Sequence, residues 1–262
     1  MKIIVCMKQV PAGTKVEIDP ETGAMKRMSG ATRTNPYDLF ALEVALQLRE
    51  QVGGTVTVLT MGPPQAESMM KDAFTMGADE AVILSDRKFA GADVLATSYT
   101  LVQGIQEIGD YDLIICGKQT TDGDTAQVGP AIAEHMNIPH AAWVAEVVEV
   151  NEQAIQVRQD LGSVSQLSEI PYPCLLTVEK DICVPRLPSY KLKKATKDKT
   201  VRILGFDDIK DKDLSRYGLV GSPTSVERMF APPEKEKQVY LQGNAEEKTE
   251  ALYNVLTGKK LI

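Results

Sequence analysis

The sequence predicts an α/β fold, in which a doubly wound parallel sheet is followed by additional strands and a C-terminal extension. Strand-like and helix-like patterns alternate along the first half of the chain, as a parallel sheet requires because its crossovers are helical. Each predicted helix between two of these strands is followed by glycine, which commonly ends helices. The 262 residues, 43% of them hydrophobic, are sufficient for one sizeable core with further structure around it.

The alternating elements of the first half can be assigned in order. Strands are predicted at residues 2–6, 55–60, 81–84 and 112–116. Helices are predicted at residues 38–48, 65–76, 92–108 and 131–136. The insertion after the first strand contains a predicted hairpin at residues 16–25, with its turn at residues 19–23.

The start of the first helix contains two residues of interest. Asn35 is disfavoured as a helical residue because it precedes Pro36. Asp38 either caps the helix or contacts a ligand, and the sequence leaves both readings open.

The pattern changes near Trp143, where shorter strands follow one another. They are predicted at residues 144–150, 154–158 and 174–178. From Thr196 the chain is polar and marked by prolines, before a short amphipathic helix at residues 246–256. We therefore expect an α/β domain at residues 1–195 and a C-terminal arm with a helix at residues 196–262. A segment of this composition either packs on a partner or forms a poorly ordered tail.

The connection at residues 117–130 has the composition of a ligand-binding loop. A strand, a polar loop and a helix in succession present backbone N–H groups to a phosphate. Gly117, Gly123 and Gly129 allow close approach of a ligand. Hydrogen-bond donors are supplied by Thr120, Thr121, Thr125 and Gln127. The alternative is an ordinary strand-to-helix connection, although such connections usually span about 2–6 residues.

The predicted strand order gives this loop a neighbour. In the common order 3-2-1-4-5, the first and fourth strands flank the topological switch point, where open parallel sheets bind ligands. The crevice is then lined by residues 6–10 and by the loop at residues 117–130. Local sequence and fold geometry therefore point to the same nucleotide or phosphate site.

Composition argues against several classes of protein. The net charge of −7 comes without a compensating basic groove, which argues against nucleic-acid binding. We expect no membrane insertion, because no apolar run is long enough to span a bilayer. The start, residues 1–8, is too short and too soon charged for a secretory signal. The four cysteines form no CxxC pair, so we expect no disulfides and a cytoplasmic protein.

Catalytic and metal-binding signatures are missing from the sequence. It contains no GxGxxG after the first strand, no phosphate-binding GxxxxGK[ST], no GxSxG and no HExxH. His135 and His140 have no accompanying ligand set, so we expect no structural metal. An alternative interpretation is that Asp122 and Asp124 coordinate Mg²⁺, although acidic residues at this spacing are frequent in turns. We predict no catalytic residues and a site that holds a cofactor, which performs the chemistry.

Segments along nearly the whole chain resemble the β subunit of electron transfer flavoproteins. The resemblance is specific because the segments occur together and in order. They are residues 5–10, 35–38, 60–63, 76–79, 117–119 with the following loop, and 186–188 before a lysine-rich segment. Residues 161–163 depart from the acidic and glycine pair expected there, which weakens inference about that segment's contacts.

The resemblance implies a heterodimer, with redox activity only in the complex. An α subunit would hold a redox-active FAD, and the C-terminal arm of this chain would pack on it. The β subunit of ordinary members binds AMP, whereas that of electron-bifurcating members binds a second FAD that oxidises NADH. The electrons then pass to ferredoxin or flavodoxin and, through the α-subunit FAD, to an acyl-CoA dehydrogenase.

The loop at residues 121–130 resembles that of the bifurcating members more than that of the AMP-binding ones. Small residues at positions 123, 125 and 126 leave backbone amides accessible to a pyrophosphate, whereas an additional acid would repel it. We therefore expect FAD, with AMP as the alternative. A third reading is an ATP-using enzyme or nucleotide sensor of the same fold. It lacks the expected glycine-rich loop after the first strand, where residues 9–13 stand instead.

The resemblance also implies the site residues. The base or ring system would be surrounded by Cys6, Asn35, Pro36, Tyr37, Asp38 and Met61. The ribose and phosphates would be held by Asp122, Gly123, Asp124, Thr125, Ala126, Gln127, Val128, Gly129 and Pro130, and Gly117 and Thr121 would also bind the cofactor. Leu187 and Pro188 match the family's partner-recognition loop, with the alternative that Leu187 folds back onto its own domain.

Overall fold

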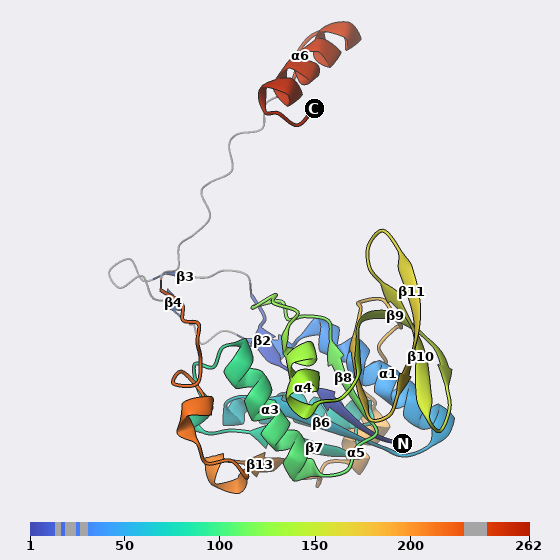
Figure 1. Ribbon diagram of the computed structural model, residues 1–262, viewed down its shortest axis with the longest axis vertical. Helices are drawn as coiled ribbons and strands as arrows, with labels where there is room; N and C mark the ends of the chain where they lie inside the picture. The colour runs from blue at the N-terminus through green and yellow to red at the C-terminus, as the bar shows by residue number, and fades with distance from the viewer. Residues whose placement is uncertain (14–16, 19–24, 27–30, 228–239) are drawn as a thin grey trace. The chain divides into compact units, whose positions relative to one another are not determined.

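A computed structural model provides the coordinates of the chain, and it describes residues 1–13, 17–18, 25–26, 31–227 and 240–262 (Figure 1). It divides into two compact units. The first comprises Met1–Glu17 and Lys26–Glu227, and it contains the large sheet and the candidate site. The second comprises Ile18–Met25 and Arg228–Ile262 and includes helix α6 (Ala245–Gly258).

The first unit is built on a nine-stranded sheet with the order β11-β10-β9-β12-β8-β1-β6-β7-β13. Its strands are β1 (Lys2–Cys6), β6 (Thr55–Met61), β7 (Glu80–Leu84), β8 (Leu113–Gly117), β9 (His140–Val150), β10 (Ala154–Asp160), β11 (Ser165–Pro171), β12 (Cys174–Val178) and β13 (Arg202–Leu204). The pairs β9–β10 and β10–β11 are antiparallel, and the other pairs are parallel. The doubly wound prediction is confirmed, because β7-β6-β1-β8-β12 is the order 3-2-1-4-5.

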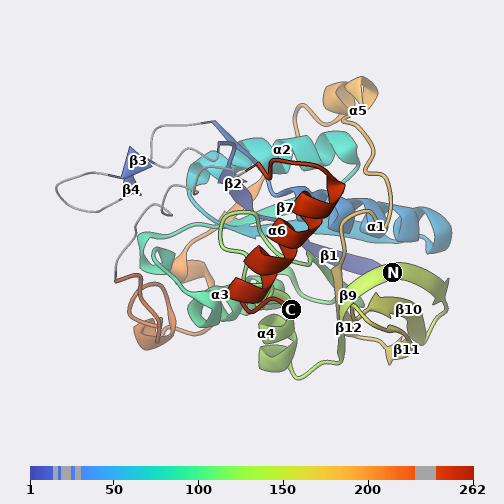
Figure 2. The same ribbon diagram turned by 90° about the horizontal axis from the view of Figure 1, so that it is seen from above.

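Helices cover both faces of this sheet because successive residues of a strand point to opposite faces. Ile3 and Val5 of β1 pack in one core cluster with α1 (Pro36–Val52) and α2 (Glu67–Met76). Ile4 and Cys6 pack in a second cluster with α3 (Val94–Ile108) and α4 (Val128–Met136). Figure 2 shows α1 and α2 on one side of the strands and α3 and α4 on the other. Cys6 and its register partner Cys116 therefore face the α3–α4 side.

The predicted helices are present, but the start of α1 differs from one reading of the sequence. Asn35 occupies the N-cap position without a side-chain capping bond, and Pro36 begins the helix. Asp38 therefore lies inside the first turn and does not cap the helix. Its side chain turns toward β1 instead, where Oδ2 accepts a hydrogen bond from the Lys8 amide at 2.7 Å.

Smaller elements complete the described residues. Strand β2 (Gln9–Pro11) pairs with β5 (Thr32–Thr34), and β3 (Glu17–Ile18) pairs with β4 (Met25–Lys26), as expected for the predicted hairpin. The predicted turn at residues 19–23 lies outside the described residues. Short helices are η1 (Pro64–Ala66), η2 (Arg87–Phe89), α5 (Tyr190–Ala195), η3 (Phe206–Asp208) and η4 (Leu214–Arg216). Among the described residues, none of the helices is both long and apolar enough to cross a membrane.

The first unit extends beyond residue 195, where the sequence pattern becomes polar. Strand β13 pairs with β7 at the sheet edge, and the ring of Tyr217 packs against Phe89 and Phe206. This aromatic cluster attaches residues 206–217 to the α3 face of the sheet. The proposed role of residues 196–262 as an arm on an α subunit stays a prediction.

Candidate functional site

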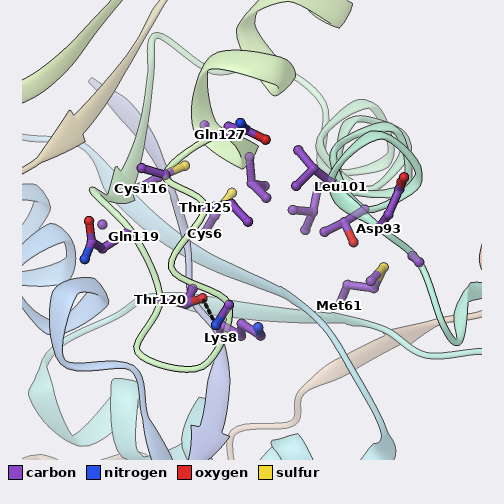
Figure 3. Close-up of a pocket in the computed structure, with 18 of the residues that line it drawn as sticks. Cys6, Lys8, Met61, Asp93, Leu101, Cys116, Gln119, Thr120, Thr125 and Gln127 are labelled. Atoms are coloured by element: carbon purple, nitrogen blue, oxygen red, sulfur yellow. Dashed lines mark hydrogen bonds between the residues drawn. The ribbon is translucent and has the colours of Figure 1, made fainter. Parts of the chain in front are cut away.

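A cavity of about 530 Å³ lies at the carboxyl ends of β1 and β8 (Figure 3). Six parts of the first unit line it: the end of β1, the end of β6, the first turn of α1, the N-terminal half of α3, the loop between β8 and α4, and residues 224–226. This is the predicted switch point, and the volume falls in the usual range of small-molecule sites, about 300–1,000 Å³.

The lining of the cavity combines an apolar part with a polar part. Met61 and Leu101 lie on one side of the cavity in Figure 3, and Gln119 lies at the other. Val94 and Val226 add to the apolar lining, whereas Thr120, Thr125 and Gln127 add polar groups. A ligand with a flat apolar ring and a charged, hydrogen-bonding tail matches this division.

The first turn of α4 offers unpaired backbone donors to the cavity. The first N–H groups of a helix have no partner within the helix. The N-cap residue, Gln127, makes no side-chain capping bond, and Pro130 has no N–H to offer. The amides of Val128 and Gly129 are therefore the orphan donors of this turn, and both residues line the cavity. An anion at this end also gains from the helix dipole.

The loop before α4 adopts a backbone conformation suited to anions. Asp124 and Ala126 have φ angles of 53° and 55°, which non-glycine residues adopt infrequently. Gln127, next to Ala126, is in the right-handed region. Adjacent residues of opposite hand direct successive N–H groups into one concavity, which is how backbone nests bind phosphate.

The two acidic side chains of the loop are both engaged with other residues. Asp122 forms an ion pair with Lys8, whose Nζ lies 2.7 Å from each carboxylate oxygen. Burial acts to raise the pKa of Asp122, but the Lys8 and Thr120 hydrogen bonds outweigh burial and hold this pKa below its usual value. Asp124 accepts a hydrogen bond at its Oδ1 from the side-chain Nε2 of Gln119.

Asn35 connects the start of α1 to the loop. Its Nδ2 donates to Oδ1 of Asp38 and to the carbonyl of Gln119, both at 2.9 Å, and its Oδ1 accepts from the Thr121 amide at 3.3 Å. Asp38 is 4% exposed, and burial raises its pKa to about 7 against the opposing hydrogen bonds of the Lys8 amide and Asn35. The charge on this carboxyl group therefore changes near neutral pH.

The start of α3 forms the opposite wall together with residues 222–226. Oδ1 of Asp93 accepts from the Ala96 amide at 3.1 Å and so caps α3. Oδ2 accepts from the Thr224 amide at 3.1 Å and from the Thr224 hydroxyl at 2.7 Å. The N-terminus of α3 is therefore already capped by a carboxylate, whereas the N-terminus of α4 is not.

The predicted cofactor residues fall into two groups. Those that line the cavity are Cys6, Asp38, Met61, Gly117, Gly123, Thr125, Ala126, Gln127, Val128 and Gly129. Those that do not line it are Asn35, Pro36, Tyr37, Thr121, Asp122, Asp124 and Pro130. Gly117 also has a packing role, since a Cβ there would lie 2.5 Å from Oδ1 of Asp38. Ligand contact by these residues stays a prediction.

Other lining residues are not among the predicted cofactor residues. Five of them lie in the two segments predicted to line the crevice: Met7, Lys8, Lys118, Gln119 and Thr120. The rest lie outside those segments: Ala92, Asp93, Val94, Thr97, Leu101, Cys116, Thr224 and Val226. Asp93 carries a usable signal, because a capping residue after the third strand places the next helix start at the same sheet edge. No local pattern identifies Thr224 or Val226.

The predicted docking residues lie in the loop between β12 and α5. Leu187 is 85% exposed, so its side chain does not fold back onto the first unit. Pro188 is exposed as well. A role in partner docking stays a prediction.

A mostly parallel α/β sheet with a cavity at its switch point is the arrangement in which doubly wound proteins hold nucleotide and flavin cofactors. The family model "Electron transfer flavoprotein domain" matches residues 22–208, and the chain belongs to that family. Members of this family transfer electrons, and relatives with the β-subunit name imply an α-subunit partner.

Three curated relatives illustrate the match. The electron transfer flavoprotein subunit beta of Clostridium acetobutylicum is 46% identical over 228 residues, 87% of either chain. Protein FixA of Bradyrhizobium diazoefficiens is 43% identical over 263 residues, 98% of this chain and 91% of the relative. The caffeyl-CoA reductase-Etf complex subunit CarD of Acetobacterium woodii is 43% identical over 236 residues, 90% of this chain and 89% of the relative.

Proposed function

We propose that this chain is the β subunit of an electron-bifurcating electron transfer flavoprotein. It binds FAD in the cavity at the ends of β1 and β8, and together with an α subunit it oxidises NADH. One electron passes to ferredoxin or flavodoxin. The other passes through the α-subunit FAD to an acyl-CoA dehydrogenase.

The observation that carries the proposal is the pairing of an apolar wall with an uncapped helix start in one cavity. A diphosphate requires converging N–H donors, which the amides of Val128 and Gly129 supply. A flat ring system requires apolar surface, which Met61 and Leu101 supply. The residues present therefore fit a flavin dinucleotide, and a bound FAD would supply the hydride acceptance and the separation of the electron pair.

The contrast between the two helix starts orients the ligand. The N-terminal amides of α3 face the carboxylate of Asp93, which repels a phosphate. The α4 start has no such charge, and a cation of the lining, Lys8, is held by Asp122 in the loop that precedes this helix. The phosphates are therefore expected at α4 and the ring system toward Leu101 and Met61. The protein's own role is to bind, orient and enclose the cofactor.

The names of two relatives support the proposed acceptor. One is a subunit of a caffeyl-CoA reductase-Etf complex, and another is an acryloyl-CoA reductase electron transfer subunit. Both names connect an electron transfer protein with a reductase of a CoA thioester. An acyl-CoA dehydrogenase is the corresponding class of partner for this chain.

Cofactor analysis of the purified complex tests the proposal. The chain is co-expressed with its α subunit, and the flavin and AMP released on denaturation are counted per heterodimer. Two FAD, together with bleaching of the flavin absorbance by NADH, are the expected result. One FAD and one AMP, without reduction by NADH, would refute FAD binding here and leave an AMP-binding electron carrier.

A further inference from the structure

The loop at residues 179–189, between β12 and α5, is fixed immediately before and after its exposed apolar tip. Leu187, 85% exposed, and Pro188 form this tip. Arg186 precedes the tip and is bound to α1. Ser189 follows it and donates its amide to the Thr75 carbonyl at 2.8 Å, near the end of α2. The tip is therefore held between two helices of the first unit.

Arg186 makes the denser of the two attachments. Its Nε and Nη2 donate to the two carboxylate oxygens of Glu43 at 2.8 and 3.0 Å, and its backbone amide adds a bond at 3.0 Å. Its Nη1 and Nη2 also donate to Glu50 at 2.6 and 3.3 Å. Glu43 and Glu50 lie two turns apart on one side of α1, so a single guanidinium spans both. We call these three residues the Arg186 clamp.

The clamp is rigid because Glu43 is almost buried, with a side chain that is only 5% exposed. Burial acts to raise the pKa of Glu43, but the hydrogen bonds from Arg186 outweigh burial and hold this pKa below its usual value. A bidentate guanidinium fixes direction as well as distance, which a lysine cannot do. The backbone bond from Arg186 fixes the chain itself, one residue before Leu187.

Helix α1 connects the clamp to the cavity. Its first turn carries Asp38, which lines the cavity, and the same helix carries Glu43 and Glu50 further along. A helix is a stiff element, so the loop tip has a fixed position relative to the cavity. Electron exchange with a docked protein requires such a fixed geometry.

We propose that Arg186 is a positioning residue, which holds Leu187 and Pro188 in the conformation that docks the acyl-CoA dehydrogenase. This inference rests on the proposed function. Without the clamp the tip samples other conformations, and the complex must order it on binding. Affinity for the dehydrogenase then falls, whereas cofactor binding and the chemistry of the docked complex are unchanged.

The test compares variants of the complete α–β complex in transfer to purified dehydrogenase at varied dehydrogenase concentration. Arg186→Lys keeps the positive charge but cannot form the paired hydrogen bonds to the carboxylate of Glu43. We expect a KM for the dehydrogenase raised about tenfold, with kcat within about twofold. Arg49→Lys is the matched control, because Arg49 also leaves α1 to bind a carboxylate, that of Asp79 at 3.0 Å, which is not part of the clamp. It should leave both constants unchanged.

A double-mutant cycle separates positioning from a direct contact. Leu187→Ala should raise KM by itself, and Arg186→Lys should add no further effect in its presence. Additive effects would overturn the positioning role. An unchanged KM in Leu187→Ala would instead refute docking at this loop, and a normal FAD count shows whether the cofactor proposal is affected.

Glu50→Gln tests whether a change in KM comes from a general loss of stability, because it weakens only the exposed ion pair of the clamp. It should give a smaller rise in KM, about threefold, with the melting temperature of the parent. If KM rises across these variants in proportion to the decrease in melting temperature, the cause is general destabilisation, and the positioning role of Arg186 is refuted.

Discussion

The ammonium group of Lys8 lies 2.7 Å from the carboxylate of Asp122, and this contact joins the end of β1 to the loop before α4. Both side chains are partly exposed, at 44% and 32%, so the pair by itself adds little stability. Its importance lies in its place, because Lys8 is a cation of the cavity lining and Asp122 neutralises it.

Substituting Lys8 and substituting Asp122 should have opposite effects on the affinity for an anionic nucleotide. Lys8→Gln removes a cation and should weaken binding about tenfold, whereas Asp122→Asn frees Lys8 and should strengthen it. Calorimetric titration of the complex, stripped of its nucleotide, measures both affinities. Lys2→Gln is the control, since Lys2 forms a comparable pair with Asp110 at the other end of β1. Equal affinities for Lys8→Gln and Lys2→Gln would contradict a phosphate site beside Lys8.

The stability of the protein should carry a component that depends on Asp38. Its pKa is raised by burial from 3.8 to about 7, so between these values the native state binds more protons than the unfolded state. The free energy of unfolding therefore falls as pH rises through this window, by at most about 1.4 kcal/mol per pH unit for one group. Asp38→Asn cannot ionise and lacks this component.

Urea denaturation at a series of pH values measures the effect of Asp38. The difference in unfolding free energy between the parent and Asp38→Asn should change between about pH 4 and pH 7, in favour of the variant as pH rises. A constant difference across that range would show that Asp38 does not titrate there.

A glutamate at position 123 should expel the cofactor and leave the fold intact. A Cβ on Gly123 would lie 3.5 Å from the Thr120 hydroxyl, an ordinary contact, so the backbone accommodates a side chain. The added carboxylate would lie in the cavity lining and repel phosphates. The expected result for Gly123→Glu is loss of the FAD bound by the β subunit, with the melting temperature of the cofactor-free parent. Gly13→Glu, where the Cβ meets nothing within 4 Å, serves as the control. Retention of this FAD would contradict the assignment of the loop.

The Asp93 side chain should contribute to both stability and binding, because it caps α3 and holds Thr224. Asp93→Ala is expected to lower the free energy of unfolding by about 1–2 kcal/mol. Thr224→Val keeps the cap and removes one hydroxyl bond. It should leave stability nearly unchanged and weaken nucleotide binding about threefold.

Denaturation and nucleotide titration of these two variants distinguish the roles. Thr196→Val is the control for Thr224→Val, since its hydroxyl also makes one hydrogen bond, to the Leu192 carbonyl, outside the cavity lining. Normal nucleotide affinity in Thr224→Val would show that residues 222–226 border the cavity without enclosing the ligand.

The core of the fold can be predicted because its signals are local. The apolar run of β8 and the helical spacing of α1 lie within single segments, and alternation of such segments leaves few possible topologies. Strands β11 and β13 give no comparable signal. The first is mostly polar and forms through antiparallel pairing with the preceding strand, β10. The second spans three residues and forms through pairing with β7, which lies much earlier in the chain.

Local sequence signals likewise identify one part of the candidate site and not the other. Its loop, from Gly117 to Gly129, can be identified from the sequence because glycines, small residues and a following helix are contiguous. The amino-acid sequence also determines the family, through matches spread along the chain. Asp93, Leu101 and Thr224 enter the cavity only through folding, since strand order places the start of α3 across the cavity from the start of α4, and Asp93 holds the segment after Tyr217. Hydrogen bonds and packing between distant segments decide that wall, and no local pattern of residues encodes them.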